Sequence, residues 1–255
     1  KYLAQFLSDP RVIRVPRLLW WLILHGIILR FRPAKVARLY QTIWTDEGSP
    51  LMCISRKQEA ALQAQLEHST GQRIPVQLAM SYGEPSLTTA GRKLAASAVE
   101  RIIVLPLYPQ YSSSTTAAVF DGLANALKPC PDIPELIFIR DYWAREDYLQ
   151  ALANSVQEFW DEHGKPDRLL LSFHGIPQRY EDTGDPYPSL CRKTAAAVAS
   201  RLGLADDQWS ESFQSRFGRE EWVKPYTDVL LEQWGNDDSI QRVDVICPAF
   251  AADCL

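Results

Sequence analysis

The residue types that could carry chemistry stand just after apolar runs of the sequence. His174, one of only four histidines, lies in the segment Ser172 to Pro177 (SFHGIP) at such a place. A neutral imidazole poised near pH 7 accepts a proton or binds a metal ion, and the flanking Gly175 leaves room for a bulky substrate. The same ring could instead be a turn histidine bonded to a neighbouring backbone group. The position of His174 in the sequence does not favour either interpretation.

Three further segments follow apolar runs in the same way: Pro106 to Thr116, Ser210 to Gly218 and Cys247 to Cys254. The hydroxyls of Ser112 to Thr116 could bind a phosphate or carboxylate at the start of a helix, or they could be ordinary helix caps. Asp253 could orient a base or a cation, or it could cap a turn.

Aromatic residues gather in these same segments. They suit a large, flat, apolar ligand, and they would also suit an interface between domains. The residues are Tyr108, Tyr111, Phe173, Tyr187, Trp222 and Phe250.

The elements that must position these residues alternate along the chain. Short runs that are apolar throughout predict strands, and the amphipathic stretches between them predict helices, a pattern typical of parallel βαβ units covered on both faces. The fold class is therefore α/β, with side chains at the strand ends forming the site. The predicted strands are Ile74 to Met80, Arg101 to Leu107, Glu135 to Ile139, Arg168 to Phe173, Trp209 to Gln214 and Val243 to Cys247. The predicted helices are Pro33 to Trp44, Arg56 to His68, Thr88 to Glu100, Thr115 to Leu127, Glu146 to His163, Ser189 to Leu202 and Tyr226 to Trp234.

The chain divides most naturally at Lys128 to Pro134, a stretch with three prolines and little periodicity. We expect two domains, 1–133 and 134–255, and a cleft between such domains is the usual place for a ligand. Within the second domain, Asp185 and Pro186 predict the start of a helix that ends before Gly203.

Charge is distributed unevenly along the 255 residues. Residues 1–45 hold eight basic residues and one acidic residue, Asp9, for a formal charge of +7; the whole chain carries −4, which leaves −11 for the other 210 residues. The basic segment surrounds the apolar run Leu18 to Leu29, which is too short to span a bilayer and lacks a signal-peptide cleavage site. On composition this run is core or a membrane-surface segment, with core favoured.

Several function classes lack their signatures. The sequence has none of the common nucleotide, zincin or nucleophile-elbow motifs, and an acidic chain with one basic patch is a poor partner for nucleic acid. The five cysteines are scattered and never form a CxxC pair, which indicates reduced cytosolic thiols and not a disulfide framework or zinc site.

Five motifs together resemble the ferrochelatase family, in the family's order and with its spacing. The match extends over essentially the whole chain and is closest to the bacterial enzymes that make protoheme. The segment Glu47 to Leu51 and the basic apolar start also resemble the family. The motifs are Tyr108 to Thr116 (YPQYSSSTT), Leu171 to Pro177 (LSFHGIP), Gly184 to Pro188 (GDPYP), Gln214 to Asp228 and Cys247 to Leu255 (CPAFAADCL).

This resemblance implies an enzyme that inserts ferrous iron into protoporphyrin IX, the last step of heme biosynthesis, on two Rossmann-like domains with the porphyrin in the cleft between them. It makes His174 the active-site histidine, as base, metal ligand or both. It also implies that the catalytic glutamate would follow Leu255, so we expect a fragment lacking sequence at both ends. The residues assigned to the porphyrin pocket or to the catalytic segment are Tyr82, Tyr111, Tyr187, Trp222, Phe250 and Asp253.

The chain departs from the family pattern at three places. The family's opening strand and loop would lie before Lys1, and Ser81 stands where many relatives have an arginine before the tyrosine. Ser113 occupies the position of a cysteine in relatives that carry an iron–sulfur cluster. We therefore expect no cluster and no permanently bound cofactor, with Fe²⁺ as a substrate.

The expected partners are protoporphyrin IX, ferrous iron and a membrane surface. The resemblance reverses the preference for core at Leu18 to Leu29, because the equivalent family segment forms part of the active-site lip. We expect a cytoplasmic monomer, peripheral on the inner face of the membrane. Two alternatives stay open: another tetrapyrrole chelatase, using a coproporphyrin, sirohydrochlorin or cobalt substrate, and a non-catalytic porphyrin or heme carrier.

Overall fold

The computed structural model describes residues 2–97 and 99–252, and for residues 32–36 and 39 it describes the backbone only. The chain forms two compact units that are interleaved in sequence. Unit 1 consists of residues 1–106, 113–139 and 252–255, and unit 2 of residues 107–112 and 140–251. The predicted domain boundary after residue 133 stays a prediction.

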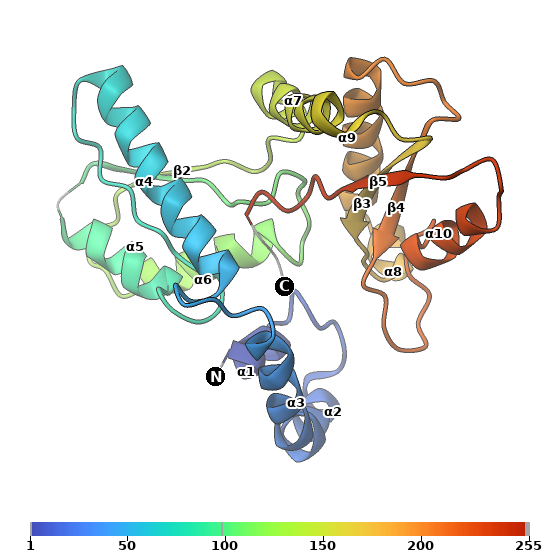
Figure 1. Ribbon diagram of the computed structural model, residues 1–255. Helices are drawn as coiled ribbons and strands as arrows, with labels where there is room; N and C mark the ends of the chain where they lie inside the picture. The colour runs from blue at the N-terminus through green and yellow to red at the C-terminus, as the bar shows by residue number, and fades with distance from the viewer. Residues whose placement is uncertain (1, 98, 253–255) are drawn as a thin grey trace. The chain divides into compact units, whose positions relative to one another are not determined.

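Unit 1 begins with short helices and ends in a two-stranded parallel sheet (Figure 1). In this sheet Arg101 pairs with Glu135 and Val104 with Phe138. Helices α5 and α6 pack against each other, with Gly91 of α5 next to Leu123 and Leu127 of α6, and Ala90 is also buried. Its elements are α1 (Tyr2–Ser8), α2 (Arg17–Ile23), the π-helix η1 (Leu24–Ile28), α3 (Leu29–Gln41), α4 (Pro50–Thr70), α5 (Leu87–Ala96), β1 (Arg101–Val104), α6 (Thr116–Leu127) and β2 (Glu135–Phe138).

Unit 2 is built on a three-stranded parallel sheet of order β4-β3-β5. The central strand β3 is almost fully buried, as expected when both faces of a parallel sheet are covered. Its elements are α7 (Glu146–His163), β3 (Arg168–His174), α8 (Gln178–Asp182), α9 (Tyr187–Arg201), β4 (Trp209–Gln214), α10 (Thr227–Gly235) and β5 (Val243–Ile246).

The alternation of side chains along β3 sets the two faces of this sheet. Leu169, Leu171 and Phe173 enter the core formed with α7 and α9. Ser172 points the other way and bonds to Thr227 of α10 at 3.2 Å. The sheet is thus covered by α7 and α9 on one face and by α10 on the other (Figure 1).

These strands and helices confirm the α/β class and most of the predicted elements. Five of the six predicted strands are present, and the helix after Asp185 begins at Tyr187 and ends before Gly203, which has a φ of +66°. The helix predicted at Pro33 to Trp44 begins earlier, at Leu29, and ends at Gln41.

The strand predicted at Ile74 to Met80 is wrong. The segment forms no strand, and its only bridge joins Met80 to Ser86. Side chains of α4 take the place of a neighbouring strand: Gln63 accepts from the Val76 amide at 2.9 Å and donates to the Ile74 carbonyl at 2.7 Å, and Glu59 accepts from the Leu78 amide at 2.7 Å. An apolar run predicts a strand, but it does not show which groups form the hydrogen bonds of its backbone.

Candidate functional site

The carboxyl edge of the unit 2 sheet places His174 at the end of its central strand. His174 pairs with Gln214 of β4, and β5 runs parallel on the other side of β3. Extending the register of Leu171 with Ile246 brings the turn after β5 beside the end of β3. The segments following all three strands therefore converge here, as predicted from the sequence.

The His174 ring has its tautomer set by the next residue. Its Nδ1 lies 2.7 Å from the Gly175 carbonyl oxygen, which can only accept, so Nδ1 carries the hydrogen. Nε2 is then left with a lone pair. His174 is an exposed residue, but the protein around its ring removes part of the surrounding water and thereby lowers the pKa of the imidazole. The site thus offers a neutral imidazole with a free acceptor nitrogen.

Gly175 allows the backbone to pass very close to β4. Its amide donates to the Gln214 carbonyl at 2.8 Å. A Cβ at this position would lie 2.9 Å from that carbonyl oxygen and 3.2 Å from the Trp222 ring. The predicted role of Gly175, room for a substrate, stays a prediction; in this structure the missing side chain makes room for the protein's own backbone and indole.

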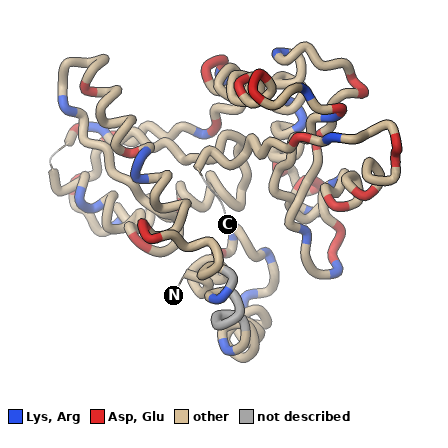
Figure 2. The backbone as a smooth tube through the Cα atoms, in the orientation of Figure 1, with Lys and Arg blue, Asp and Glu red and all other residues tan. Residues whose placement is uncertain are grey.

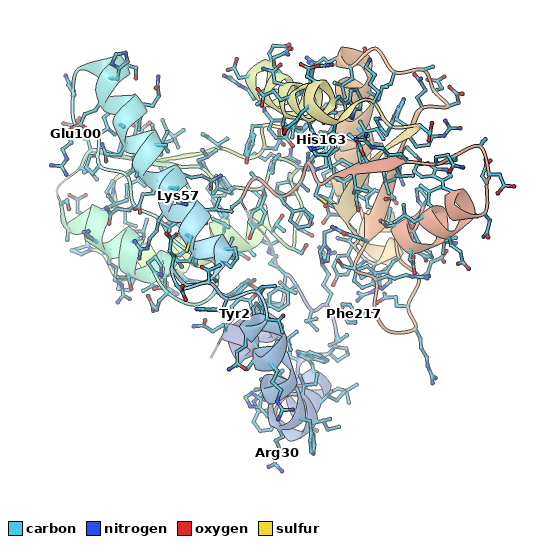
Figure 3. The ribbon with its side chains drawn as sticks, in the orientation of Figure 1. Tyr2, Arg30, Lys57, Glu100, His163 and Phe217 are labelled. Atoms are coloured by element: carbon cyan, nitrogen blue, oxygen red, sulfur yellow. The ribbon has the colours of Figure 1, made fainter. Side chains whose placement is uncertain are left out.

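Trp222 lies beneath the His174 turn and is only 5% exposed. It forms an antiparallel bridge with Pro177, and its indole Nε1 donates to the Phe217 carbonyl at 3.1 Å. Val223 continues the contact by donating to the Ile176 carbonyl at 3.0 Å. The loop after β4 is thereby fastened to the histidine turn, with Phe217 exposed at its tip (Figure 3).

Tyr187 and Phe250 lie in the same unit in different surroundings. Tyr187, the first residue of α9, is buried in the core, and its amide donates to Asp185 Oδ1 at 3.2 Å. Burial raises the pKa of its hydroxyl, which therefore stays protonated. Phe250 is half-buried in the turn after β5, where its amide donates to the Cys247 carbonyl at 3.2 Å.

Tyr111 is half-buried, with the Arg140 guanidinium 4.1 Å from its ring centroid. Sequence reasoning missed Arg140, although this basic residue lies two positions after the end of β2, at the same kind of strand end as the others. The cation covers one face of a ring that the sequence assigns to the porphyrin pocket.

The two remaining predicted residues, Tyr82 and Asp253, stay predictions. Tyr82 lies in unit 1, where its hydroxyl donates to Asp9 Oδ2 at 2.8 Å and its ring contacts Phe6. Asp253 lies outside the described residues. Across residues 2–97 and 99–252, no group of three or more His, Cys, Asp or Glu side chains could hold a metal ion.

Comparison with known proteins gives one consistent result. The model of the ferrochelatase family matches residues 1–255. The ferrochelatase of Aeromonas hydrophila is 57% identical over 254 residues, which cover 100% of this chain and 78% of that protein. Ferrochelatase 1 of Shewanella oneidensis is 55% identical over 255 residues, covering 100% and 76%, and the ferrochelatase of Nitrosococcus oceani is 53% identical over 255 residues, covering 100% and 69%.

Proposed function

The chain belongs to the ferrochelatase family, and from this premise we propose how its own residues carry out the family's reaction. That reaction inserts ferrous iron into protoporphyrin as part of heme biosynthesis. The free porphyrin carries two N–H protons at its centre, and both must leave as the metal enters. The enzyme therefore has to supply a proton acceptor and a path for a divalent cation.

His174 is the proton acceptor in this proposal. The observation that carries it is the hydrogen bond from Nδ1 to the Gly175 carbonyl, which leaves Nε2 as the only ring atom able to accept. Nε2 takes one pyrrole proton, and its lone pair could equally bind the incoming cation. Asp253 is proposed for the second proton or for guiding the cation, as its place after Phe250 in the family motif implies.

Aromatic residues supply the apolar surface for the macrocycle in this scheme. Trp222 and Phe250 support it by lying on the segments that follow β4 and β5 of unit 2, and Tyr111 lies on the segment of unit 2 that follows β1 in the sequence. Tyr187 supports the site through the start of α9, and Tyr82 is proposed to contribute from unit 1. Packing a flat ring against a shaped surface can strain it toward the puckered form that accepts a metal. No permanent cofactor is needed, because iron is the substrate.

The test of this assignment is His174→Ala in the full-length protein. Loss of a general base costs about 10²- to 10⁴-fold in rate, so we expect zinc insertion, followed by zinc-porphyrin fluorescence, to fall by at least about 100-fold. Porphyrin binding, followed by protein fluorescence quenching, should persist. Near-normal turnover would remove His174 from the centre of the mechanism. Competition between protoporphyrin and coproporphyrin tests the substrate class. A preference for coproporphyrin would indicate a related tetrapyrrole chelatase instead.

We also propose that unit 1 contacts the inner face of the membrane from the cytoplasm. The helices α2, η1 and α3 carry a set of exposed apolar residues, here called the apolar patch. Leu18 and Phe31 are 78% and 74% exposed, which is far outside the range for core residues. The patch consists of Leu18, Leu19, Trp21, Leu22, Ile27 and Phe31.

Basic residues accompany the apolar patch, which is the combination that favours an anionic lipid surface. Arg17 and Arg30 are exposed on α2 and α3, and Arg30 projects away from the helix in Figure 3. None of the helices in the described residues is long and apolar enough to cross a membrane. The proposed contact is therefore peripheral, and we propose a monomer in solution, to be checked by sedimentation equilibrium.

The two tryptophans of α2 provide a matched pair for testing the membrane proposal. Trp21 is 57% exposed, whereas Trp20 is half-buried and its Nε1 donates to the Leu7 carbonyl at 2.7 Å. Trp21→Ser should weaken binding to anionic vesicles by about tenfold, equivalent to about 1.4 kcal/mol, with thermal stability unchanged. Trp20→Ser should mainly lower stability. Equal vesicle binding by Trp21→Ser and the wild type would contradict the proposal.

A further inference from the structure

A fully buried amide lies in the segment that joins the two units. Gln110 is 1% exposed, and its Nε2 donates to Thr194 Oγ1 at 3.1 Å and, less closely, to the Tyr148 hydroxyl at 3.4 Å. Both acceptors already donate elsewhere, Thr194 to the Leu190 carbonyl and Tyr148 to the Pro248 carbonyl. Both hydroxyl groups can therefore only accept a hydrogen bond from Gln110, so the amide nitrogen must face them and the amide oxygen must face away.

Stability alone does not account for this amide. Its carbonyl oxygen, Oε1, is buried and has no hydrogen-bond partner among the described residues. A buried acceptor without a partner costs free energy, and an apolar side chain of the same length would avoid that cost.

Tyr148 links Gln110 to the turn after β5. Its hydroxyl donates to the Pro248 carbonyl at 2.6 Å, across 100 residues of sequence. Pro248 is buried, and the same turn carries Phe250. Because β5 pairs with β3, this turn lies next to the strand end that carries His174. A chain of two hydrogen bonds thus runs from Gln110 through Tyr148 to the neighbour of the histidine.

A second buried side chain fastens the same joining segment. Ser112 is 1% exposed and donates to Asp185 Oδ2 at 2.9 Å, while Asp185 Oδ1 accepts from the Tyr187 amide. Tyr111 lies between Gln110 and Ser112 in the sequence, and the Arg140 guanidinium lies over its ring. The position of Tyr111 in unit 2 is therefore set from both sides by buried polar contacts.

We propose that Gln110 is a positioning residue for metal insertion, which acts through Tyr148 to hold the Cys247–Phe250 turn beside His174 and through Thr194 to hold the Tyr111 segment against α9. This inference rests on the proposed function and adds to it a group that touches no substrate. Catalytic groups lose rate steeply when displaced, by up to about 10²-fold for a shift of about 1 Å. Burial raises the pKa of Tyr148, so its hydroxyl stays protonated and available as a donor to Pro248.

Gln110→Met in the full-length protein tests the proposal, because methionine has a similar length and no polar atoms to leave unpaired. We expect kcat for zinc insertion to fall by about tenfold or more. The dissociation constant for protoporphyrin should stay within about twofold, and the thermal midpoint should be equal to or higher than that of the wild type. A lower midpoint together with native kcat would overturn the proposal, because it would make the amide purely structural.

Tyr148→Phe tests the same link from its other end and keeps the proposal falsifiable if Gln110→Met fails to fold. In the double variant the loss of kcat should be no larger than in the worse single variant, because both changes break one chain. Losses that multiply would contradict the proposal.

Val198→Ala is the matched control for these variants. Val198 is fully buried in the same core and belongs to none of these hydrogen bonds, so its variant should lower the thermal midpoint and keep native kcat. If the wild type itself inserts no metal, the proposed function fails. If the wild type is active and Gln110→Met matches it in kcat, only this inference fails.

Discussion

His174 holds one ring nitrogen inside a hydrogen bond and leaves the other available. The bond to Gly175 also raises the proton affinity of the ring, but the loss of water around it outweighs that effect, and the net result is a lowered pKa. A base that is neutral over the physiological range can take a pyrrole proton without first losing one of its own.

The pH dependence of the reaction should reflect this lowered pKa. Activity requires neutral His174, so it should rise as pH rises through the pKa of the ring, which lies below its ordinary value of 6.5. We expect the acidic limb of kcat/KM for zinc insertion to have its midpoint below 6.5, measured between about pH 5 and about pH 8. A midpoint near or above pH 7 would mean that another group controls the profile.

Gly175 is the residue at which the smallest substitution should have the largest effect. In Gly175→Ala the new Cβ would meet backbone at 2.9 Å, and neither the Gln214 carbonyl nor the buried Trp222 ring can move freely. We expect the free energy of unfolding to fall by about 1–3 kcal/mol and activity to fall with it, measured by urea unfolding and zinc insertion.

Gly235→Ala is the control for this substitution. Gly235 ends α10 with no atom within 4 Å of an added Cβ, so alanine there should be neutral or slightly stabilising. Equal stability of the two alanine variants would show that the backbone beside His174 can relax.

How far the sequence could predict the site depends on the distance between partners. His174 could be found because its signal is local: an apolar strand, a histidine and a glycine in succession. Gln110 gave no such signal, because its partners lie 38 and 84 residues away and its own segment reads as part of a hydroxyl-rich turn. Burial of a polar side chain is a property of the folded core, and the local pattern does not contain it.

At the scale of elements, the π-helix η1 determines whether the apolar patch is continuous. A π turn accommodates one residue more than an α turn, so it changes the direction of every later side chain by about 100° relative to a regular helix. By this geometry we expect Ile27 and Phe31 to lie on the side of Leu18 and Leu22. All four residues are exposed, while Leu24 is 2% exposed. Periodicity analysis with a regular helix would place the two groups on different faces.

Changes in length at Gly26 test this geometry. Deleting Gly26 should convert the π turn to a regular α-helical turn and keep Ile27 and Phe31 on the side of Leu22, so vesicle binding should stay within about twofold of the wild type. Inserting one alanine after Gly26 should turn them away by about 100° and weaken binding, measured by vesicle sedimentation. The opposite order of affinities would exclude the patch as one continuous surface.

The failed strand at Ile74 to Met80 is the element-scale limit of sequence reading. The run is apolar, but the structure has no strand there, and its backbone is hydrogen-bonded by Gln63 and Glu59 of α4. In the sequence, Gln63 and Glu59 resemble any other polar residues on a helix, so their bonds to the backbone of another segment cannot be predicted from the local pattern.

At the scale of the whole molecule, the two signs of charge are separated along the chain. Basic residues predominate through the N-terminal helices, and acidic residues are prominent on α7 and α10 (Figure 2). The formal charge of +7 over residues 1–45 within a chain of −4 gives an acidic protein a local attraction to anionic surfaces.

Membrane binding should therefore depend on salt concentration, even though the net charge of the whole chain is negative. We expect binding to vesicles containing anionic lipid to exceed binding to neutral vesicles, and to weaken markedly between about 0.05 M and about 0.5 M salt, as the basic residues are screened. Binding measured by co-sedimentation that is indifferent to both lipid charge and salt would assign the contact to the apolar residues alone.

The interleaving of the two units also has a consequence for synthesis. Residues 107–112 emerge from the ribosome in the middle of unit 1, but the partners of Gln110 and Ser112 are Tyr148, Asp185 and Thr194, all made later. At about 5–20 residues per second, their polar side chains wait seconds for those partners, and β5 arrives later still. We therefore expect the nascent chain to keep this short segment out of the core of unit 1 until those partners are made, and the hydroxyl-rich, proline-containing sequence there is poorly suited to joining a core prematurely.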